Sequence, residues 1–129
     1  MATIEVTKEN LEKTLSDNAI VLIDFWAPWC APCKAFGPVF DAASDRNEDI
    51  VFGKVNTDEE QEIAAAFGIR SIPTLVAFKE QIGVFAQAGA LPAEALDEII
   101  GQLRELDMDE VRAEIAKQEQ EAAEEGEQS

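Results

Sequence analysis

The chain has 129 residues, of which 47% are hydrophobic, enough for one hydrophobic core but hardly for two. Its formal net charge of −17 would repel the phosphates of nucleic acid and the headgroups of anionic lipid, so neither is an expected partner. No apolar run approaches the roughly 20 residues of a membrane span, and no N-terminal stretch has the pattern of a signal peptide. We expect a soluble, cytoplasmic protein, and we expect it to be a monomer.

The first part of the chain predicts a strand, a helix and a second strand. Residues 3–6 have a short strand pattern, and Thr7 is the expected N-cap of a helix over residues 8–15. Residues 19–26 are mostly apolar and rich in β-branched side chains, as expected of a strand buried on both faces. Asp24 is the one acid in this run, so it would be a buried carboxylate.

The only two cysteines, Cys30 and Cys33, follow this strand at the point where a helical pattern begins. A helix N-terminus presents unpaired N–H groups and the positive end of the helix dipole, so we expect a low pKa for Cys30. Pro32 suits the first turn of such a helix, because proline removes no intrahelical hydrogen bond there. Helical cysteines at this spacing have Cα atoms roughly 5 Å apart, a separation that a disulfide tolerates.

Three kinds of chemistry are open to this cysteine pair. A purely structural disulfide would close so short a loop that it removes little entropy from the unfolded chain. A zinc site would need further ligands from carboxylates or a second chain, because the sequence contains no histidine. Redox exchange is favoured, since a C-x-x-C between a strand and a helix is the usual arrangement of a redox dithiol.

The next two elements are a helix and a buried strand. The helix covers residues 33–46 and contains Pro38, which should kink it by removing a backbone hydrogen bond. The strand covers residues 50–56, with Lys54 as its only cation. From charge alone, this lysine is either exposed at a sheet edge or paired with Asp24. The acid, in turn, is either a hydrogen-bonded carboxylate near a strand end or an acid–base group.

The following segments predict a helix, a pair of strands and another helix. Residues 58–67 should form a helix with Asp58 as its N-cap. Strands are expected over residues 75–78 and 83–88, the second at a sheet edge. The segment between them, residues 79–82, contains no glycine. We therefore do not expect a tight turn there. A helix over residues 93–106 has an apolar stripe that should cover one face of the sheet.

Residues 107–129 form an acidic extension with nine acids and two bases. Asp107 and Glu110 make a capping box, and a short apolar stripe follows them. The stripe has ended by Gln118, so a frayed helix or solvated disorder is expected beyond it. The extension is either a solubilising appendage or an arm that docks a basic partner surface.

Several motifs resemble the thioredoxin family and occur in the family's order. The resemblance is carried by Trp29-Cys30-Ala31-Pro32-Cys33, with Ala31 at the usual glycine, and by Asp24-Phe25-Trp26-Ala27, Lys54, Ser71-Ile72-Pro73-Thr74 and Gly89. It covers residues 1–106 and leaves residues 107–129 as an extension. The fold that it implies is an α/β thioredoxin fold, with a mixed central β-sheet flanked by helices on both faces.

The resemblance also implies roles for individual residues. Cys30 would attack a substrate disulfide, and Cys33 would resolve the resulting mixed disulfide. Asp24 would assist proton transfer to or from Cys33, and Lys54 would tune that acid. A cis peptide bond before Pro73 would lie against the disulfide, whereas the physics of X-Pro bonds alone predicts trans.

The family's docking surface for an extended peptide would here consist of Trp29, Ala31, Pro32, Ile72, Pro73 and Gly89. From the sequence alone, Ile72 is equally a core residue. The implied activity is reduction of disulfide-containing proteins, with no bound cofactor or metal and with electrons from NADPH through a flavoprotein thioredoxin reductase. Two alternatives are a disulfide oxidant or isomerase with an unusually stable thiolate, and a binding or co-chaperone module that uses the acidic tail.

Overall fold

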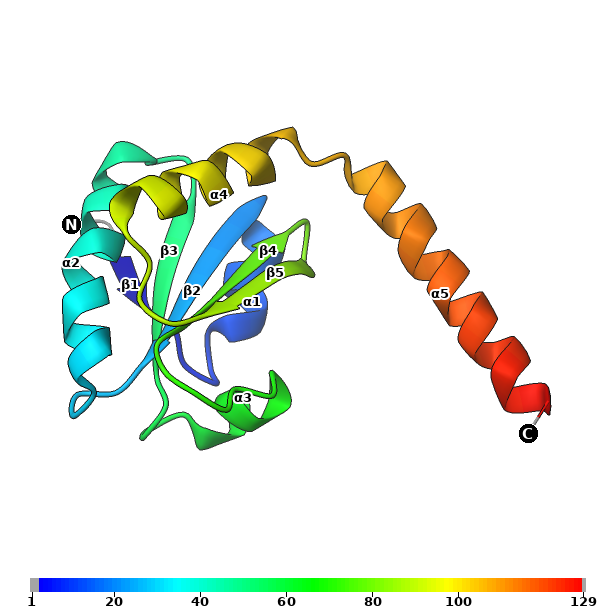
Figure 1. Ribbon diagram of the computed structural model, residues 1–129, viewed down its shortest axis with the longest axis horizontal. Helices are drawn as coiled ribbons and strands as arrows, with labels where there is room; N and C mark the ends of the chain where they lie inside the picture. The colour runs from blue at the N-terminus through cyan, green and yellow to red at the C-terminus, as the bar shows by residue number, and fades with distance from the viewer. Residues whose placement is uncertain (1–2, 129) are drawn as a thin grey trace.

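The computed structural model describes residues 3–128, which form a mixed β-sheet covered by helices (Figure 1). The elements are β1 (Thr3–Glu5), α1 (Leu11–Asp17), β2 (Ile20–Trp26), α2 (Ala31–Arg46), β3 (Val51–Asn56), α3 (Gln61–Ala66), β4 (Thr74–Lys79), β5 (Ile82–Ala88), α4 (Ala93–Glu105) and α5 (Met108–Gln128). The strands lie in the order β1-β3-β2-β4-β5. Because β2 pairs in parallel with β3 and antiparallel with β4, the sheet is mixed, as predicted.

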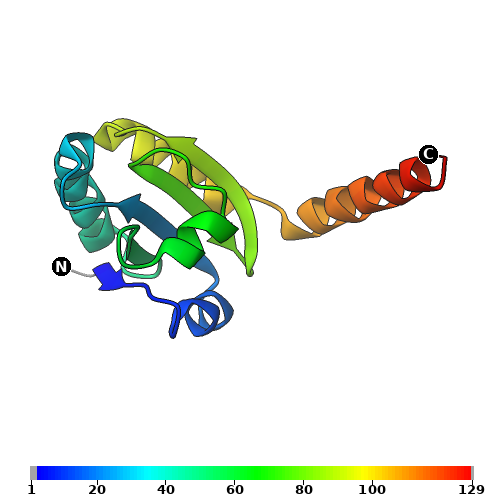
Figure 2. The same cartoon turned by 90° about the horizontal axis from the view of Figure 1, so that it is seen from below.

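Successive side chains of β2 enter two different apolar clusters, one on each face of the sheet. Leu22 packs in a cluster with Phe36 of α2 and Leu96 of α4. Ile23 packs in the other cluster with Ile63 of α3, and side chains of α1 lie against the same cluster. Figure 2 shows α2 and α4 on one side of the sheet and α1 and α3 on the other. The predicted thioredoxin fold, with helices on both faces, is confirmed.

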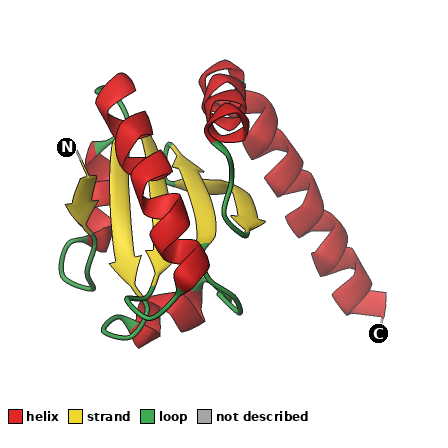
Figure 3. Ribbon diagram, turned by 60° about the vertical axis from the view of Figure 1, so that its left-hand side comes forward, coloured by secondary structure: helices red, strands yellow, loops and turns green. Residues whose placement is uncertain are grey.

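The central strand β2 is buried along nearly its whole length, and only Trp26 at its end is partly exposed. Neighbouring strands satisfy its backbone on both edges, and the two apolar clusters cover its faces. Figure 3 shows the strands lying beneath the helices. Each large apolar side chain buried in this way contributes about 1.5–3 kcal/mol to folding. The end of β2 is therefore firmly placed, and the chain passes from it directly toward α2.

The side-chain caps predicted for α1 and α3 are wrong. Asn10 occupies the N-cap position of α1, and its Oδ1 accepts the N–H of Thr7 at 2.8 Å. Glu60 occupies the N-cap position of α3, and its side chain makes no capping hydrogen bond. Asp58 instead accepts a hydrogen bond from Trp29 Nε1. Both helices begin later than predicted, and backbone-bonded turns precede them, with Asn10 N–H donating to Thr7 O and Glu59 N–H to Asn56 O.

The connection between β4 and β5 is tighter than the sequence predicted. Lys79 pairs with Ile82, so Glu80 and Gln81 alone make the turn. Their φ angles are 50° and 71°, the left-handed conformation that such two-residue hairpins require and that glycine or asparagine usually supplies. The expectation that no tight turn forms here is wrong, because strand pairing on both sides imposes this geometry on two other residues.

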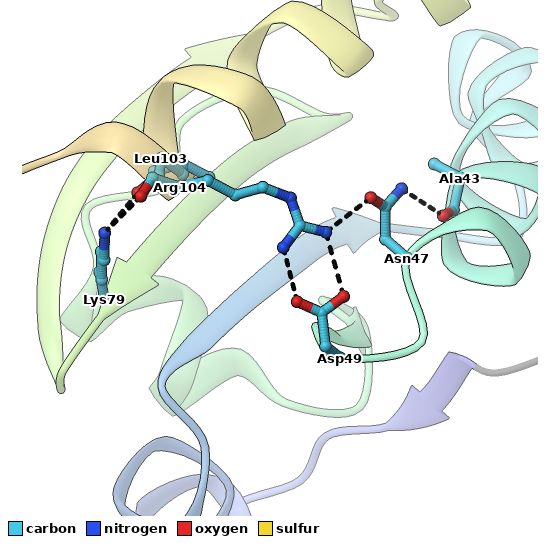
Figure 4. A network of polar contacts seen from close by, with 6 residues as sticks. All are labelled: Ala43, Asn47, Asp49, Lys79, Leu103 and Arg104. Carbon is cyan, nitrogen blue, oxygen red and sulfur yellow. Dashed lines mark hydrogen bonds and ion pairs between the residues drawn. The ribbon is translucent and has the colours of Figure 1, made fainter.

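Polar contacts fix the C-terminal end of α4 to the rest of the domain (Figure 4). Arg104 donates to the two carboxylate oxygens of Asp49 at 2.5 and 3.0 Å and to Asn47 Oδ1 at 2.9 Å. This hydrogen-bonded guanidinium lowers the pKa of Asp49 below its usual value. Lys79 Nζ donates to the carbonyl oxygen of Leu103 at 2.6 Å, which satisfies an acceptor left free at the helix end. These contacts orient α4 over the sheet.

The long helix α5 touches the domain only at its start. Met108 is buried, and Arg112 forms an ion pair with Glu80 in the β4–β5 turn. The Oδ1 of Asp107 accepts hydrogen bonds from two N–H groups in the first turn, at 2.9 and 3.3 Å, so the capping role predicted for this residue is confirmed. Figures 1 and 2 show the rest of the helix pointing away from the sheet.

The outer part of α5 is helical where fraying was expected. The helix continues past Gln118 to its end at Gln128, although the side chains of residues 116–126 are all exposed. Alanine, glutamate and glutamine are good helix formers, so local propensity supports the helix here without packing. Within residues 3–128, no helix is long and apolar enough to cross a membrane.

The hairpin geometry predicts that Gln81→Gly stabilises the protein. Gln81 has positive φ and an exposed side chain, and a left-handed residue with a Cβ costs about 1 kcal/mol. Urea denaturation should therefore show a gain of about that size over wild type. Gln87→Gly, in the extended strand β5, is the matched control and should lower stability. No gain in the Gln81 variant would contradict the account of the turn.

Candidate active site

The two cysteines lie where β2 ends and α2 begins. They are joined as a disulfide with Cα atoms 5.2 Å apart, which agrees with the separation expected from helical spacing. The helix begins at Ala31, slightly earlier than predicted, with Cys30 as its N-cap and Pro32 in its first turn. Ala31 and Pro32 are exposed, whereas each cysteine is only 4% exposed. The helix therefore places Cys30 at its positive end and Cys33 within its first turn.

The N-terminus of α2 acts directly on the sulfur of Cys30. Its Sγ accepts the N–H of Cys33 at 3.3 Å and lies 3.7 Å from the carbonyl oxygen of Ile72. A backbone donor and the helix dipole both favour negative charge on this sulfur once the disulfide opens. The geometry is suited to a thiolate at Cys30.

The segment before β4 forms a second wall of the site. Its Ile72–Pro73 peptide bond is cis, in agreement with the expectation from the family. Ile72 packs against the cysteine pair, and the carbonyl of Pro73 accepts the N–H of Gly89 at 2.8 Å. Gly89 has a φ of 98°, a conformation that favours glycine. Residues expected for peptide docking thus come together beside the disulfide from distant parts of the chain.

Trp29 lies on the surface next to the disulfide, with 69% of its area exposed. Its indole Nε1 donates to both carboxylate oxygens of Asp58, at 3.2 and 3.1 Å, which fixes the ring. A cavity of about 210 Å³ is lined by this ring together with Ile69, Arg70 and Ile72. Neither Asp58 nor Arg70 was predicted from the sequence to lie at the site. For Arg70 a signal was present, because it directly precedes the Ser71-Ile72-Pro73-Thr74 motif.

Asp24 is an acid buried inside β2, with 1% of its area exposed. Within residues 3–128, neither of its carboxylate oxygens has a hydrogen-bond partner. Burial disfavours the charged form and raises the pKa of Asp24 from 3.8 to about 7, although Lys54 acts in the opposite direction. A carboxyl with this pKa gains and loses a proton near neutral pH, as a general acid–base group must.

Lys54 lies beside Asp24 in the sheet, but its ion pair is with another acid. The two residues are register partners on the neighbouring strands β3 and β2. Lys54 Nζ is 3.9 Å from Asp41 Oδ1 on α2 and 5.6 Å from the centre of the Trp26 ring. The lysine therefore lowers the pKa of Asp24 through space, while its ion pair is with Asp41 on α2.

Asp41 is a charged neighbour of the site that the sequence analysis missed. The sequence did contain a signal, because Cys33, Gly37 and Asp41 recur at a spacing of four and so share one face of α2. A Cβ at Gly37 would lie 3.8 Å from Lys54 Nζ, so the ammonium packs close to that face. The negative charge of Asp41 adds to burial in raising the pKa of Asp24.

The arrangement combines three chemical capacities at one end of β2. The dithiol can open and close with its Cα atoms already at disulfide distance, a buried acid titrates near neutrality, and an apolar wall stands beside the sulfur. Among residues 3–128, no group of three or more cysteines and acids is placed to hold a metal ion.

Comparisons with known proteins point to one family. A family model described as Thioredoxin matches residues 2–102. Putative thioredoxin 2 from Streptomyces coelicolor is 59% identical over 121 residues, which cover 94% of this chain and 90% of that protein. A thioredoxin from Porphyra purpurea is 41% identical, over 79% of this chain and 97% of its own length.

A solved structure agrees with these sequence matches. A mutant thioredoxin from Halobacterium salinarum is 35% identical and has a TM-score of 0.76, over 81% of this chain and 93% of that one. The structural match therefore agrees with the family found from sequence. The chain belongs to the thioredoxin family, and it is a thiol-disulfide oxidoreductase whose redox centre is the Cys30–Cys33 disulfide.

Proposed function

We propose that Cys30 and Cys33 reduce protein disulfides in two successive exchanges. The Cys30 thiolate attacks one substrate sulfur, forming a mixed disulfide and releasing the other sulfur as a thiolate. The Cys33 thiolate then attacks Cys30 Sγ, which closes the internal disulfide and releases the second substrate sulfur. The substrate gains two electrons and two protons, and the dithiol of this protein is oxidised.

The observation that carries this assignment is the position of Cys30 at the N-cap of α2. Exposure does not distinguish the two sulfurs, because both cysteines are 4% exposed. Charge does distinguish them, since Cys30 Sγ accepts a backbone N–H at the positive end of the helix. We therefore assign Cys30 as the nucleophile and Cys33 as the resolving thiol.

We assign Asp24 as the group that exchanges a proton with Cys33. The resolving thiol must lose its proton inside a buried site, where water is a poor acceptor. A carboxyl with a pKa of about 7 matches this task near neutral pH. Lys54 on the neighbouring strand opposes the shift caused by burial, and we assign it the role of tuning the acid.

The proposed peptide-docking surface consists of Trp29, Ala31, Pro32, Ile72, Pro73 and Gly89. The carbonyl of Ile72 lies beside Cys30 Sγ, where an extended peptide can pair with the backbone as an added strand. The open cavity next to Trp29 is suited to one side chain of that peptide. Docking by backbone and apolar contacts suits a reductase that acts on many disulfide-containing proteins.

The oxidised pair must be reduced again after every turnover. We propose a flavoprotein thioredoxin reductase that draws electrons from NADPH as the donor, which makes this enzyme a second partner besides the substrates. The electrons pass between sulfur atoms, so the scheme requires no cofactor bound to this chain. We place the protein in the cytoplasm as a monomer, since a reducing compartment keeps its dithiol available.

We also propose a division into a catalytic domain over residues 1–106 and an acidic extension over residues 107–129. The exposure of every side chain in residues 116–126 supports the view that the outer extension is a solubilising appendage. The buried side chain of Met108 and the Arg112–Glu80 ion pair tie the first turns of α5 to the domain. The extension is thus anchored at its base.

The division of labour between the sulfurs predicts opposite behaviour of two serine variants. Cys30→Ser should lose reductase turnover, at least a hundredfold, because the attacking thiolate is gone. Cys33→Ser should instead accumulate a mixed disulfide with substrate through Cys30. Mass spectrometry after mixing with a disulfide substrate measures the adduct. An adduct on Cys30→Ser and none on Cys33→Ser would reverse the assignment.

The proposed proton transfer predicts slower resolution in Asp24→Asn. Near neutral pH the variant should release substrate from the mixed disulfide about tenfold to a hundredfold more slowly, because an amide cannot accept the thiol proton. Stopped-flow fluorescence of Trp29 and Trp26 can follow this step. Equal rates for variant and wild type from about pH 6 to about pH 9 would remove Asp24 from the mechanism.

Asp24→Asn should also gain stability relative to wild type as the pH rises. The unfolded wild type ionises near the ordinary pKa of 3.8, whereas the folded protein keeps this proton up to about 7. Wild-type stability from this group is therefore present below the lower value and is lost as the pH rises through the upper one. In urea denaturation, the unfolding free energy of the variant minus that of wild type should rise on the order of 4 kcal/mol between these two pKa values. A constant difference would contradict the raised pKa.

The position of α5 predicts that its removal spares catalysis. A chain ending at Leu106 should reduce insulin at close to the full-length rate, since the described contacts of α5 lie away from the disulfide. It should lose about 1–2 kcal/mol of stability with the buried Met108 side chain. A chain ending at Gln118 is the control and should match full length in both measurements. A large loss of activity in the shorter chain would place α5 within the catalytic domain.

A further inference from the structure

The ammonium of Lys54 is held on the α2 side of the sheet. Its Nζ lies 3.9 Å from Asp41 Oδ1 and 5.6 Å from the centre of the Trp26 ring, and it packs close to Gly37. The ammonium thus lies between an acid of α2 and the aromatic ring of Trp26 at the end of β2.

Asp24, by contrast, accepts no hydrogen bond from residues 3–128. Its strand neighbours are Lys54 on β3 and the apolar Leu75 on β4. The charged groups that act on it are Lys54 and, from α2, Asp41. The same helix also carries Cys33, Lys34, Asp45 and Arg46, and none of these contributes to the shift. Both carboxylate oxygens of Asp24 are buried and unpartnered among residues 3–128. Lys54 thus acts on both acids, but its ion pair is with Asp41, the more exposed of the two.

We propose that Asp41 is a positioning residue for the thiol chemistry: its carboxylate holds the Lys54 ammonium on the α2 side and keeps this cation from forming an ion pair with Asp24. The inference deepens the proposed function, because it rests on Asp24 as the proton carrier. An ion pair between Lys54 and Asp24 would hold the buried acid in its charged form. By competing for the cation, Asp41 keeps the acid able to take up a proton near neutral pH.

A purely structural role for the Lys54–Asp41 pair would have a small effect. The two side chains are 27% and 40% exposed, and at 3.9 Å the contact is long for an ion pair. The Asp41 Oδ1 in this contact is itself buried and has no hydrogen-bond partner among residues 3–128. Pairs of this kind contribute about 0–1 kcal/mol to stability. The effect of this pair on the pKa of Asp24 should be larger than its effect on stability, because a charge acts more strongly on a buried group than on a solvated one.

The direct test follows the Asp24 carboxyl by carbon-13 NMR through a pH titration of the full-length oxidised protein. In this form the cysteines do not titrate, so the curve reports the carboxyl and its charged neighbours. In Asp41→Asn we expect the pKa of Asp24 to fall by roughly one pH unit, because the released ammonium moves closer to it. An unchanged pKa would overturn the proposal.

Asp97→Asn is the matched control. It also removes one carboxylate and leaves a cation unpaired, since Asp97 forms an exposed ion pair with Arg46 at 2.8 Å. This variant should leave the Asp24 titration at its wild-type position. A shift equal to that of Asp41→Asn would show a general effect of net charge and would overturn the proposal. Asp41→Glu keeps the carboxylate and should restore most of the wild-type pKa.

A second background separates action through the lysine from direct repulsion between the two acids. In Lys54→Met, Asp41→Asn should shift the pKa of Asp24 by less than about half as much as it does in the wild type. A full-sized shift in that background would show that Asp41 acts directly, and it would overturn the positioning role. Lys54 and Asp41 are both partly exposed, so these substitutions should leave the fold intact.

The pH profile of mixed-disulfide resolution links this effect to catalysis. In Asp41→Asn its inflection should move to lower pH by the same amount as the Asp24 titration. A shifted titration with a wild-type profile would support the placement of Lys54 and would contradict Asp24 as the proton carrier. The failure of the proposed function is therefore distinguishable from the failure of this inference.

Discussion

The burial of β2 between two helical layers is the constraint on which the rest of the structure depends. Strands pair with it on both edges, and apolar side chains such as Leu22 and Ile23 lock its two faces into separate clusters. The end of this strand cannot move without breaking both clusters, so the N-terminus of α2 is fixed as well. Cys30 and Cys33 thus meet substrate from a rigid platform rather than from a mobile loop.

The same burial gives Asp24 its chemistry and makes it costly. A carboxyl in the middle of this strand is shielded from water, which raises its pKa to about 7 and destabilises its charged form. An apolar side chain at this position would avoid that cost, which fits the proton-transfer role proposed for Asp24. The Lys54 and Asp41 side chains are both partly exposed, and their charges act on the pKa of this acid in opposite directions.

The periphery obeys weaker constraints than the core. The hairpin turn at Glu80 and Gln81 adopts a left-handed conformation because the strands beside it are already paired, and α5 leaves the domain after its first turns. The alignment with the Streptomyces coelicolor protein spans 121 residues, more than the proposed catalytic domain, so that relative shares part of the extension. In this protein α5 contacts the sheet and helices at its base, through Met108 and Arg112.

The sequence by itself determined the order of helices and strands, the buried strand, and the position of Cys30 at a helix N-terminus, because periodicity and local motifs encode these features directly. Only the tertiary structure decided that Asp58 binds Trp29 rather than capping α3, and that Lys54 on β3 pairs with Asp41 on α2. Competing local arrangements of a polar side chain differ by about 1 kcal/mol, so the partner brought near by folding decides between them. Such partners are distant in sequence, and no local pattern specifies them.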